Sequence, residues 1–178
     1  MGALVKKSAQ AVVVQKDEAQ YLTFLLGTEM FGIDILHIKE IIEYGSLTGV
    51  PMMPSFIRGV INLRGAVVPV VDLAARFGRA ASEVTRRSCI VIIESGTEDD
   101  KQDIGVVVDS VSEVLEIAEA DIEPAPSFGA KIRADFISGM GKVSGKFVII
   151  LNADKVLSVD EMAMLAGVSE GGSMAVAV

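Results

Sequence analysis

Two long stretches of this chain repeat one another at a constant spacing of 80 residues. The sequence FIRGVINLRGAVVPVVDLAARFG at 56–78 aligns without a gap with FISGMGKVSGKFVIILNADKVLS at 136–158. The alignment pairs phenylalanines at the first position, two glycines within each stretch, and Asp72 with Asn152. Aspartate and asparagine are both preferred helix N-cap residues, and each precedes a short apolar-periodic stretch. A repeat of this kind predicts two copies of one folding unit.

A second pair of segments extends the repeat toward the N-terminus. The sequence GIDILHIKEII at 32–42 parallels GVVVDSVSEVL at 105–115, with matching glycines at the first position and Glu40 on Glu113. Each segment follows an apolar run typical of a β-strand, YLTFLL in the first copy and CIVIIE in the second. The chain therefore contains two versions of a unit of about five short strands, joined near residues 79–88.

Short strands with glycine at the turns favour a mainly β fold of small barrels or sandwiches over a parallel α/β sheet. A capping box, Ser158-Val159-Asp160-Glu161, predicts a short helix near the C-terminus. Each unit has only about 65 residues, too few for a comfortable independent core, so the two units should bury apolar surface against each other. The groove between them is a natural place for a binding site.

These patterns divide the chain into five parts. Residues 1–19 lack periodicity and are expected to form a flexible tail. Residues 20–85 and 86–152 are the first and second barrel subdomains. A helical segment is expected at 153–168, and residues 169–178 are expected to end the chain as a loose tail.

Charge is distributed unevenly along the chain. The net charge of −8 argues against nucleic acid as a partner. Six of the seven arginines lie between residues 58 and 87, whereas residues 96–123 hold ten acids against the single Lys101. Within that acidic region, GTEDDKQD at 96–103 is expected to be a solvated hairpin loop. A basic and an acidic region suit a protein that meets two charged protein surfaces in a fixed orientation.

Several classes of site lack the residues they need in this sequence. His37 is the only histidine and Cys89 the only cysteine, so we do not expect metal sites built on histidine, Ser-His-Asp triads or internal disulfides. Phosphate-binding glycine loops and calcium-loop spacings are also missing. No apolar run approaches the roughly 18 residues of a membrane helix. We therefore expect a soluble, cytoplasmic protein without a cofactor.

The duplication separates residues that the fold needs from residues that serve another purpose. Gly59 and Gly65 recur in the second copy and are assigned to the fold, with Gly65 at a positive φ in a turn. Arg64 is replaced by serine and Asn62 by lysine in the second copy. Because a turn does not require an arginine, Arg64 is predicted to contact a partner. The alternative is that Arg64 is a solvated turn residue.

The turn Asn-Leu-Arg-Gly, flanked by glycine-apolar strands and closed by Val-Asp-Leu, is similar to a motif of the CheW family, the coupling proteins of bacterial chemotaxis arrays. FGIDILHIKEII, GVVVDSVSEVL, EPAPSF and the second repeat stretch add to the resemblance, which covers roughly residues 20–166. The regulatory domain of the kinase CheA is related. This chain has no ATP-binding motif, so it most resembles the stand-alone adaptor.

The resemblance implies two intertwined, five-stranded, SH3-like barrels without catalytic activity. It also implies two partners, namely the cytoplasmic tip of methyl-accepting chemoreceptors, bound in an apolar groove between the barrels, and the regulatory domain of the histidine kinase CheA, bound through barrel ends. Receptor state would then control kinase autophosphorylation, with the protein recruited to membrane-associated arrays and not inserted into the membrane. By motif, the residues in the partner-binding region are Ile38, Glu40, Gly59, Asn62 and Arg64.

Other functions stay open at this point. An enzyme could use carboxylates such as Asp34 and Glu40 as acid and base, if burial separated their pKa values. A small-ligand-binding double barrel is a second possibility, and a ligand-dependent rise in melting temperature would support it. Within the adaptor class, the chain could serve a chemosensory pathway that controls something other than flagella.

Overall fold

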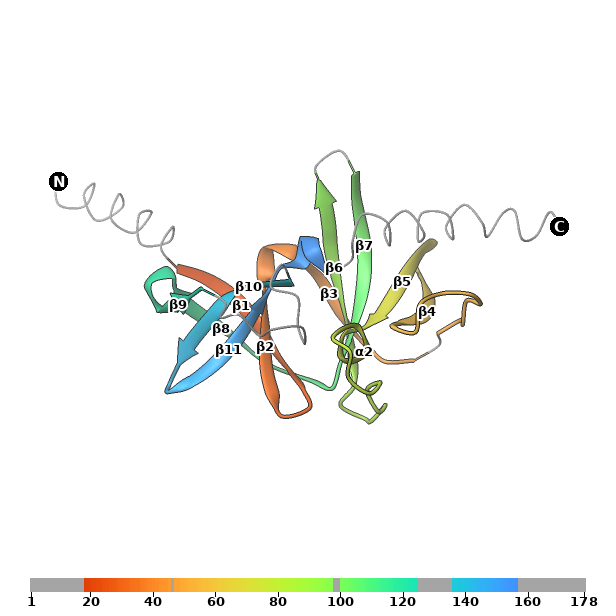
Figure 1. Cartoon of the computed structure of the whole chain (residues 1–178). Coiled ribbons are helices and arrows are strands. Elements are labelled where there is room, and N and C mark those ends of the chain that lie inside the picture. The colour runs from red at the N-terminus through yellow and green to blue at the C-terminus, as the bar shows by residue number, and fades with distance from the viewer. Residues whose placement is uncertain (1–17, 46, 98–99, 125–135, 157–178) are drawn as a thin grey trace.

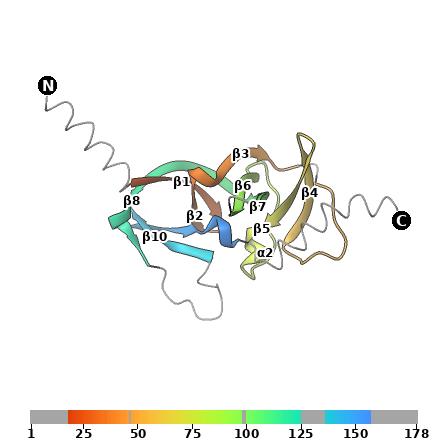
Figure 2. The same cartoon turned by 90° about the horizontal axis from the view of Figure 1, so that it is seen from above.

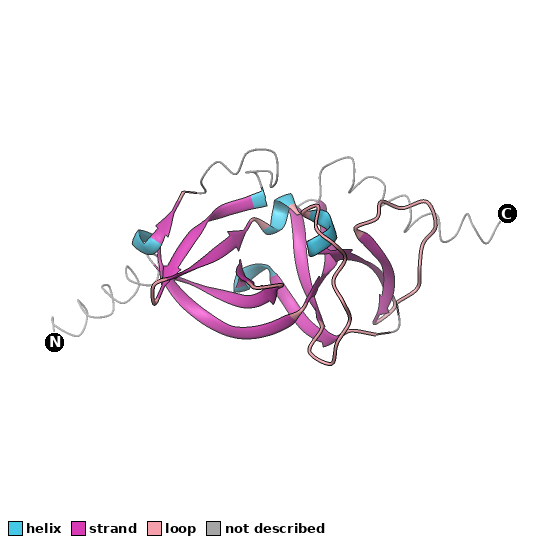
Figure 3. Ribbon diagram, turned by 60° about the horizontal axis from the view of Figure 1, so that its bottom comes forward, coloured by secondary structure: helices cyan, strands magenta, loops and turns pink. Residues whose placement is uncertain are grey.

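The structure, a computed structural model of the 178-residue chain, describes residues 18–45, 47–97, 100–124 and 136–156. Within these ranges the chain is built mainly of β-strands, and its helices are single turns (Figure 3). The strands gather in two groups that lie beside each other (Figure 1). The mainly β fold expected from the sequence is confirmed.

The strands form two sheets, which we name sheet A and sheet B. Sheet A has six strands in the order β8-β1-β2-β11-β10-β9, and sheet B has five in the order β3-β6-β7-β5-β4. The strands of sheet A are β1 (Glu18–Leu26), β2 (Glu29–Asp34), β8 (Ser110–Ala118), β9 (Ile122–Glu123), β10 (Ile137–Val143) and β11 (Lys146–Leu151). Those of sheet B are β3 (Ile38–Glu43), β4 (Ile57–Leu63), β5 (Ala66–Asp72), β6 (Cys89–Thr97) and β7 (Asp100–Val108). The short helices are η1 (Ile35–His37), α2 (Leu73–Arg76), η2 (Glu119–Asp121) and η4 (Ala153–Lys155).

Each copy of the repeat gives its first two strands to the sheet of the other copy. β1 and β2 of the first copy lie in sheet A beside β8 and β11, and β6 and β7 of the second copy lie in sheet B beside β3 and β5 (Figure 2). The two barrels are therefore intertwined, as the family resemblance implied. The predicted subdomain boundaries, 20–85 and 86–152, follow the repeat in the sequence and not the sheets, because a local strand pattern does not specify its pairing partner.

Two parallel strand pairs make this exchange possible. β5 runs parallel to β7, with Val70 opposite Gly105, and β11 runs parallel to β2, with Ile150 opposite Gly32. The two glycines are the matched first positions of the second pair of repeated segments. A Cβ atom at Gly105 would lie only 2.7 Å from Ile90 Cγ2, and one at Gly32 would be nearly as crowded. The nearest atoms are side-chain methyls, so glycine at these positions leaves room for buried side chains beside the parallel pairs.

Alternating residues of the central strands face different cores. In β6, Ile90 and Ile92 face the interior of the sheet B barrel, whereas Val91 and Ile93 belong to a larger core between the barrels. This larger core holds more buried residues than the two barrel interiors together. Its aromatic rings follow one another in contact: Phe24, Phe31, Phe77 and Phe136. The two units thus depend on each other for burial, as their small size predicted.

Asp72 is a fully buried residue at the end of β5 with a complete set of hydrogen-bond donors. Its Oδ2 accepts from Arg58 Nε at 2.9 Å and from the Ser82 backbone N–H at 3.0 Å. Its Oδ1 accepts from Ser82 Oγ at 3.3 Å and from the Ala75 backbone N–H at 3.2 Å, which caps α2. The Arg58 guanidinium also donates to the Tyr44 hydroxyl at 3.3 Å and to the Ser82 carbonyl. These partners offset the cost of burying the charge.

In the second copy, the residues at the positions of Arg58 and Asp72 are uncharged. Asn152 stands in place of Asp72 and caps η4 by accepting a hydrogen bond from the Asp154 backbone N–H at 3.1 Å, and Ser138 stands in place of Arg58. Both members of the ion pair therefore change together between the copies. Only in the first copy does an ion pair bind Ser82 and thereby hold the connection between the units.

Replacing Asp72 with asparagine should reduce the free energy of unfolding by about 3 kcal/mol, because it leaves the partly buried Arg58 guanidinium without a counter-charge. The double variant Arg58→Ser/Asp72→Asn, which reproduces the pair found in the second copy, should recover at least half of that loss. Urea unfolding of the two variants and the wild type measures both quantities. A double variant less stable than Asp72→Asn would show that Arg58 stabilises the fold through its other partners, the Tyr44 hydroxyl and the Ser82 carbonyl.

The structure differs from two predictions, one near the N-terminus and one in the acidic region. β1 begins at Glu18, so the expected tail 1–19 overlaps a strand, and residues 1–17 lie outside the described ranges. Most of the segment 96–103 is strand and not loop, because the ladder between β6 and β7 continues to Thr97 opposite Asp100.

The expected helical segment at 153–168 is described only at its start. Residues 153–155 form the single turn η4, and Val156 is buried behind it. The remainder of that segment, including the predicted capping box, and the expected tail at 169–178 lie outside the described ranges.

Candidate functional site

An ion pair joins the two edge strands of sheet B. Arg64, in the turn between β4 and β5, donates from Nη1 to Oε1 of Glu40 in β3 at 3.1 Å, and its Nη2 donates to Oε2. A backbone bridge between Thr48 and Val60 crosses the same gap. The side chains are 70% exposed for Arg64 and 26% for Glu40, and surface pairs stabilise proteins by only about 0–1 kcal/mol. The pair helps to close the barrel and still leaves most of the guanidinium open to a partner.

The β4–β5 turn has the left-handed backbone of a type I′ hairpin turn. Arg64 has a φ of +52° and Gly65 a φ of +87°, and the second copy repeats this with Ser144 at +51° and Gly145 at +78°. Asn62 Oδ1 accepts a hydrogen bond from the Gly65 backbone N–H at 2.9 Å. The positive φ expected of Gly65 is therefore confirmed.

The expectation that Asn62 and Arg64 do nothing for the fold is wrong. Asn62 fixes the turn through its hydrogen bond to Gly65, and Arg64 fixes the turn against β3 through Glu40. A residue that differs between the two copies can stabilise its own copy, because the partner it meets there differs as well. A contact of either residue with another protein stays a prediction.

Gly59 and Ile38 are held by packing. β4 bulges at Gly59, whose φ is +149°, and a Cβ atom there would lie 2.3 Å from the Thr48 carbonyl oxygen. The same bulge recurs at Gly139 in β10. Ile38 begins β3, is partly buried and packs against the core between the barrels. Of the five predicted contact residues, the structure brings Glu40 and Arg64 into contact and places Asn62 in the same turn, whereas Ile38 and Gly59 pack against other residues.

Exposed apolar side chains occur at matching positions of the two copies. Ile41 of β3 corresponds to Val114 of β8, and Val67 of β5 corresponds to Phe147 of β11. All four side chains are 43–51% exposed. Sequence reasoning missed them because apolar strand residues are ordinarily assigned to a core, although their matched positions in the repeat were a usable signal. They give each barrel an apolar surface of its own.

Lys39, next to Glu40 in β3, forms a cluster of ion pairs with charged residues of the β6–β7 hairpin. Lys39 Nζ lies 3.3 Å from Glu94 Oε2 and 3.0 Å from Asp103 Oδ1, and Lys101 Nζ lies 3.3 Å from Glu94 Oε1. Hydrogen bonds from Lys39 and then Lys101 lower the pKa of Glu94, and those to Asp103 and then Glu94 raise the pKa of Lys39. Asp103, the one acid of the region 96–123 in this cluster, is therefore paired within the fold.

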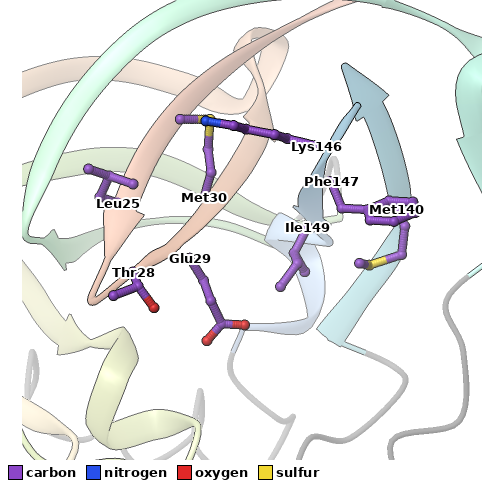
Figure 4. A pocket seen from close by; sticks show the side chains of 8 residues that line it. All are labelled: Leu25, Thr28, Glu29, Met30, Met140, Lys146, Phe147 and Ile149. Carbon is purple, nitrogen blue, oxygen red and sulfur yellow. The ribbon is translucent and has the colours of Figure 1, made fainter. Parts of the chain in front are cut away.

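A groove of about 480 Å³ lies on sheet A beside the β1–β2 turn and the β10–β11 hairpin. None of the five predicted contact residues lines it. Its volume is in the range of small-molecule sites, so the hypothesis of a ligand-binding barrel keeps a physical basis. The lining is mainly apolar with one carboxylate and one amine (Figure 4): Leu25, Thr28, Glu29, Met30, Met140, Lys146, Phe147 and Ile149.

The described part of the chain contains no group of three His, Cys, Asp or Glu side chains arranged to hold a metal ion. Burial, and then the Glu43 carboxylate, raises the pKa of the Cys89 thiol, which disfavours the reactive thiolate. No helix among the described residues is long and apolar enough to cross a membrane.

Comparison with known proteins identifies the family. Residues 20–161 match the model of the CheW-like domain, which spans both barrels and the exchanged strands. The chain therefore belongs to the CheW-like domain family.

Individual relatives agree with this assignment. The chemotaxis protein CheW of Klebsiella aerogenes is 34% identical over 168 residues, covering 94% of this chain and 96% of that protein. Protein FrzA of Myxococcus xanthus is 31% identical over 144 residues, covering 80% of this chain and 87% of that protein. The crystal structure of the scaffolding protein TtCheW from Thermoanaerobacter tengcongensis is similar with a TM-score of 0.72 and 36% identity, covering 80% of this chain and 90% of that one.

Gly65→Val should reduce the free energy of unfolding by about 2 kcal/mol, because a β-branched residue is strained at positive φ. An added Cβ at this position meets no atom within 4 Å, so the loss comes from the backbone and not from crowding. Gly65→Asn is the matched control, since asparagine tolerates the left-handed region, and it should stay close to the wild type in urea unfolding. Wild-type stability of the valine variant would contradict the turn geometry.

Proposed function

We propose that this chain is a non-catalytic coupling protein that links methyl-accepting chemoreceptors to the histidine kinase CheA, so that receptor state controls kinase autophosphorylation. The observation that carries the proposal is membership of the CheW-like domain family over nearly the whole described fold. A coupling protein has to present separate surfaces in a fixed relation. Two barrels that share strands and a common core meet that requirement.

The proposed partner-binding surface is centred on the Glu40–Arg64 pair and includes Ile38, Gly59 and Asn62. The exposed Arg64 fork can pair with a carboxylate or cap backbone carbonyls of a helical partner. The exposed Ile41 on β3, and Val67 on β5 just after the turn, would supply apolar contact area. At the centre of an interface such an arginine contributes about 2 kcal/mol or more, and at its wet rim little.

The chain would act in the cytoplasm and join membrane-associated receptor arrays through its partners. A pathway with an output other than flagellar rotation is an alternative within the same class, and it predicts the same contacts with a different genomic neighbourhood. The small-ligand alternative concerns the groove on sheet A and predicts a ligand-dependent rise in melting temperature.

Arg64→Glu should weaken binding of a receptor cytoplasmic fragment or of the CheA regulatory domain at least about tenfold, a loss of roughly 1.4 kcal/mol. The melting temperature should change little, because the side chain is mostly exposed. Isothermal titration with each partner measures the effect. Normal binding of both partners would remove the contact role of Arg64.

The exchange variant Glu40→Arg/Arg64→Glu is the matched control, because it restores the ion pair with its charges reversed. If Arg64 contacts a partner directly, the exchange variant should keep the wild-type melting temperature and still bind weakly. If the exchange variant regains full binding, the pair acts by holding β3 against the β4–β5 turn, and a direct contact of Arg64 is excluded.

A further inference from the structure

The arginines that crowd residues 58–87 differ in what they contact. Four of the six have internal partners: Arg58 with Asp72, Arg64 with Glu40, Arg79 with Glu29, and Arg76 between the rings of Phe56 and Phe136. Arg86 and Arg87 are exposed, and their side chains make no hydrogen bond or ion pair with the residues that the structure describes. Arg86 and Arg87 are thus the two arginines of the basic region whose side chains do not stabilise the described part of the fold.

These two arginines occupy the central positions of a well-built β-turn. Ser88 N–H donates to the Thr85 carbonyl at 3.1 Å, which closes the turn. The Thr85 backbone N–H donates to Ser88 Oγ at 2.8 Å, and the Arg87 backbone N–H donates to Thr85 Oγ1 at 3.1 Å. Three hydrogen bonds within four residues leave the backbone little freedom, so the Cα–Cβ bonds of both arginines leave the chain in a defined direction.

Both ends of the segment that carries the turn are tied to the body of the protein. Ser82 bonds to the buried Asp72 carboxylate through its backbone N–H and its hydroxyl, and its carbonyl accepts from Arg58. At the other end Ser88 is buried, and its carbonyl accepts from the Tyr44 backbone N–H at 3.3 Å. The segment belongs to the connection that follows α2 in Figure 1. A connection needed only to span the two units would not require this anchoring.

An apolar side chain accompanies the two arginines. Val84 is 50% exposed and lies one residue before the turn. We name Val84, Arg86 and Arg87 the basic turn. Glu83 is the one acidic residue in the segment 79–88. The basic turn thus combines a small apolar contact with two permanent positive charges, on a backbone that loses little freedom when it binds.

We propose that the basic turn binds a protein segment that presents two or more carboxylates beside an apolar side chain. Guanidinium forks match carboxylates in geometry and charge. Nucleic acid fits poorly, because two arginines on a chain of net charge −8 would contact few phosphates. An anionic membrane fits poorly as well, since recognition of such surfaces takes clusters of about four or more basic residues. This surface is separate from the Glu40–Arg64 pair and does not depend on the proposed coupling function.

The test titrates the full-length, ¹⁵N-labelled chain with the peptide Glu-Glu-Leu-Glu-Glu, which carries carboxylates on both sides of an apolar side chain, and follows the titration by NMR. The largest shifts should occur at the backbone amides of residues 84–88 and at the Nε of Arg86 and Arg87. Arg86→Glu and Arg87→Glu should each weaken binding at least about fivefold. Lys155→Glu, which makes the same charge change at an exposed residue of η4, should weaken it less than about twofold.

Three results would overturn the proposal. The first is a map of shifts centred on other cations, such as Lys101. The second is an equal effect of Lys155→Glu, which would mean that only net charge matters. The third is cosedimentation with phosphatidylserine vesicles that Arg86→Glu abolishes, in the absence of any peptide binding. Unchanged melting temperatures of the arginine variants exclude a loss of folding as the cause.

Discussion

Two short parallel strand pairs, β5 with β7 and β11 with β2, bring each half of the chain into the sheet of the other half. Gly105 and Gly32 leave room for buried side chains beside these pairs. Because neither copy completes its own barrel, the main apolar core lies between the barrels, and each barrel depends on the other for burial. The relative orientation of the two barrels is thereby fixed by the same contacts that fold them. For an adaptor this matters, because the distance between its binding surfaces is then a property of the fold.

The two copies differ in charge at the residues that hold the connection between the units. In the first copy the buried Arg58–Asp72 pair holds Ser82, and through it the segment that carries the basic turn. The second copy has serine and asparagine at these positions. Similarly, Arg64 reaches Glu40 across the open edge of sheet B, whereas the matching Ser144 is too short and uncharged to make such a pair. The charged features of the first copy therefore add contacts to a barrel that the apolar residues already specify.

The repeat in the sequence predicted the turn glycines, the helix caps and the need for a shared core. Family resemblance, and not strand patterning, supplied the intertwining, because pairing partners depend on packing between distant segments. Comparing the two copies gave a wrong prediction for Asn62 and Arg64, because a residue found in only one copy was assumed not to stabilise the fold. It could have found the Arg58–Asp72 pair, since both members change together between the copies. The exposed Ile41 and Val67 were recognisable only through their matched positions in the repeat, because strand patterning does not show which face stays uncovered.

We propose that one rigid pair of intertwined barrels connects receptor state to kinase activity. This coupling role is tested most directly by measuring autophosphorylation of a CheA-type kinase on receptor-containing membrane vesicles, with and without this chain, as receptor ligand is added. We expect the kinase rate to rise when the chain is present and to respond to receptor ligand only then. A kinase rate that is the same with and without the chain, at every ligand concentration, would contradict the proposed coupling function.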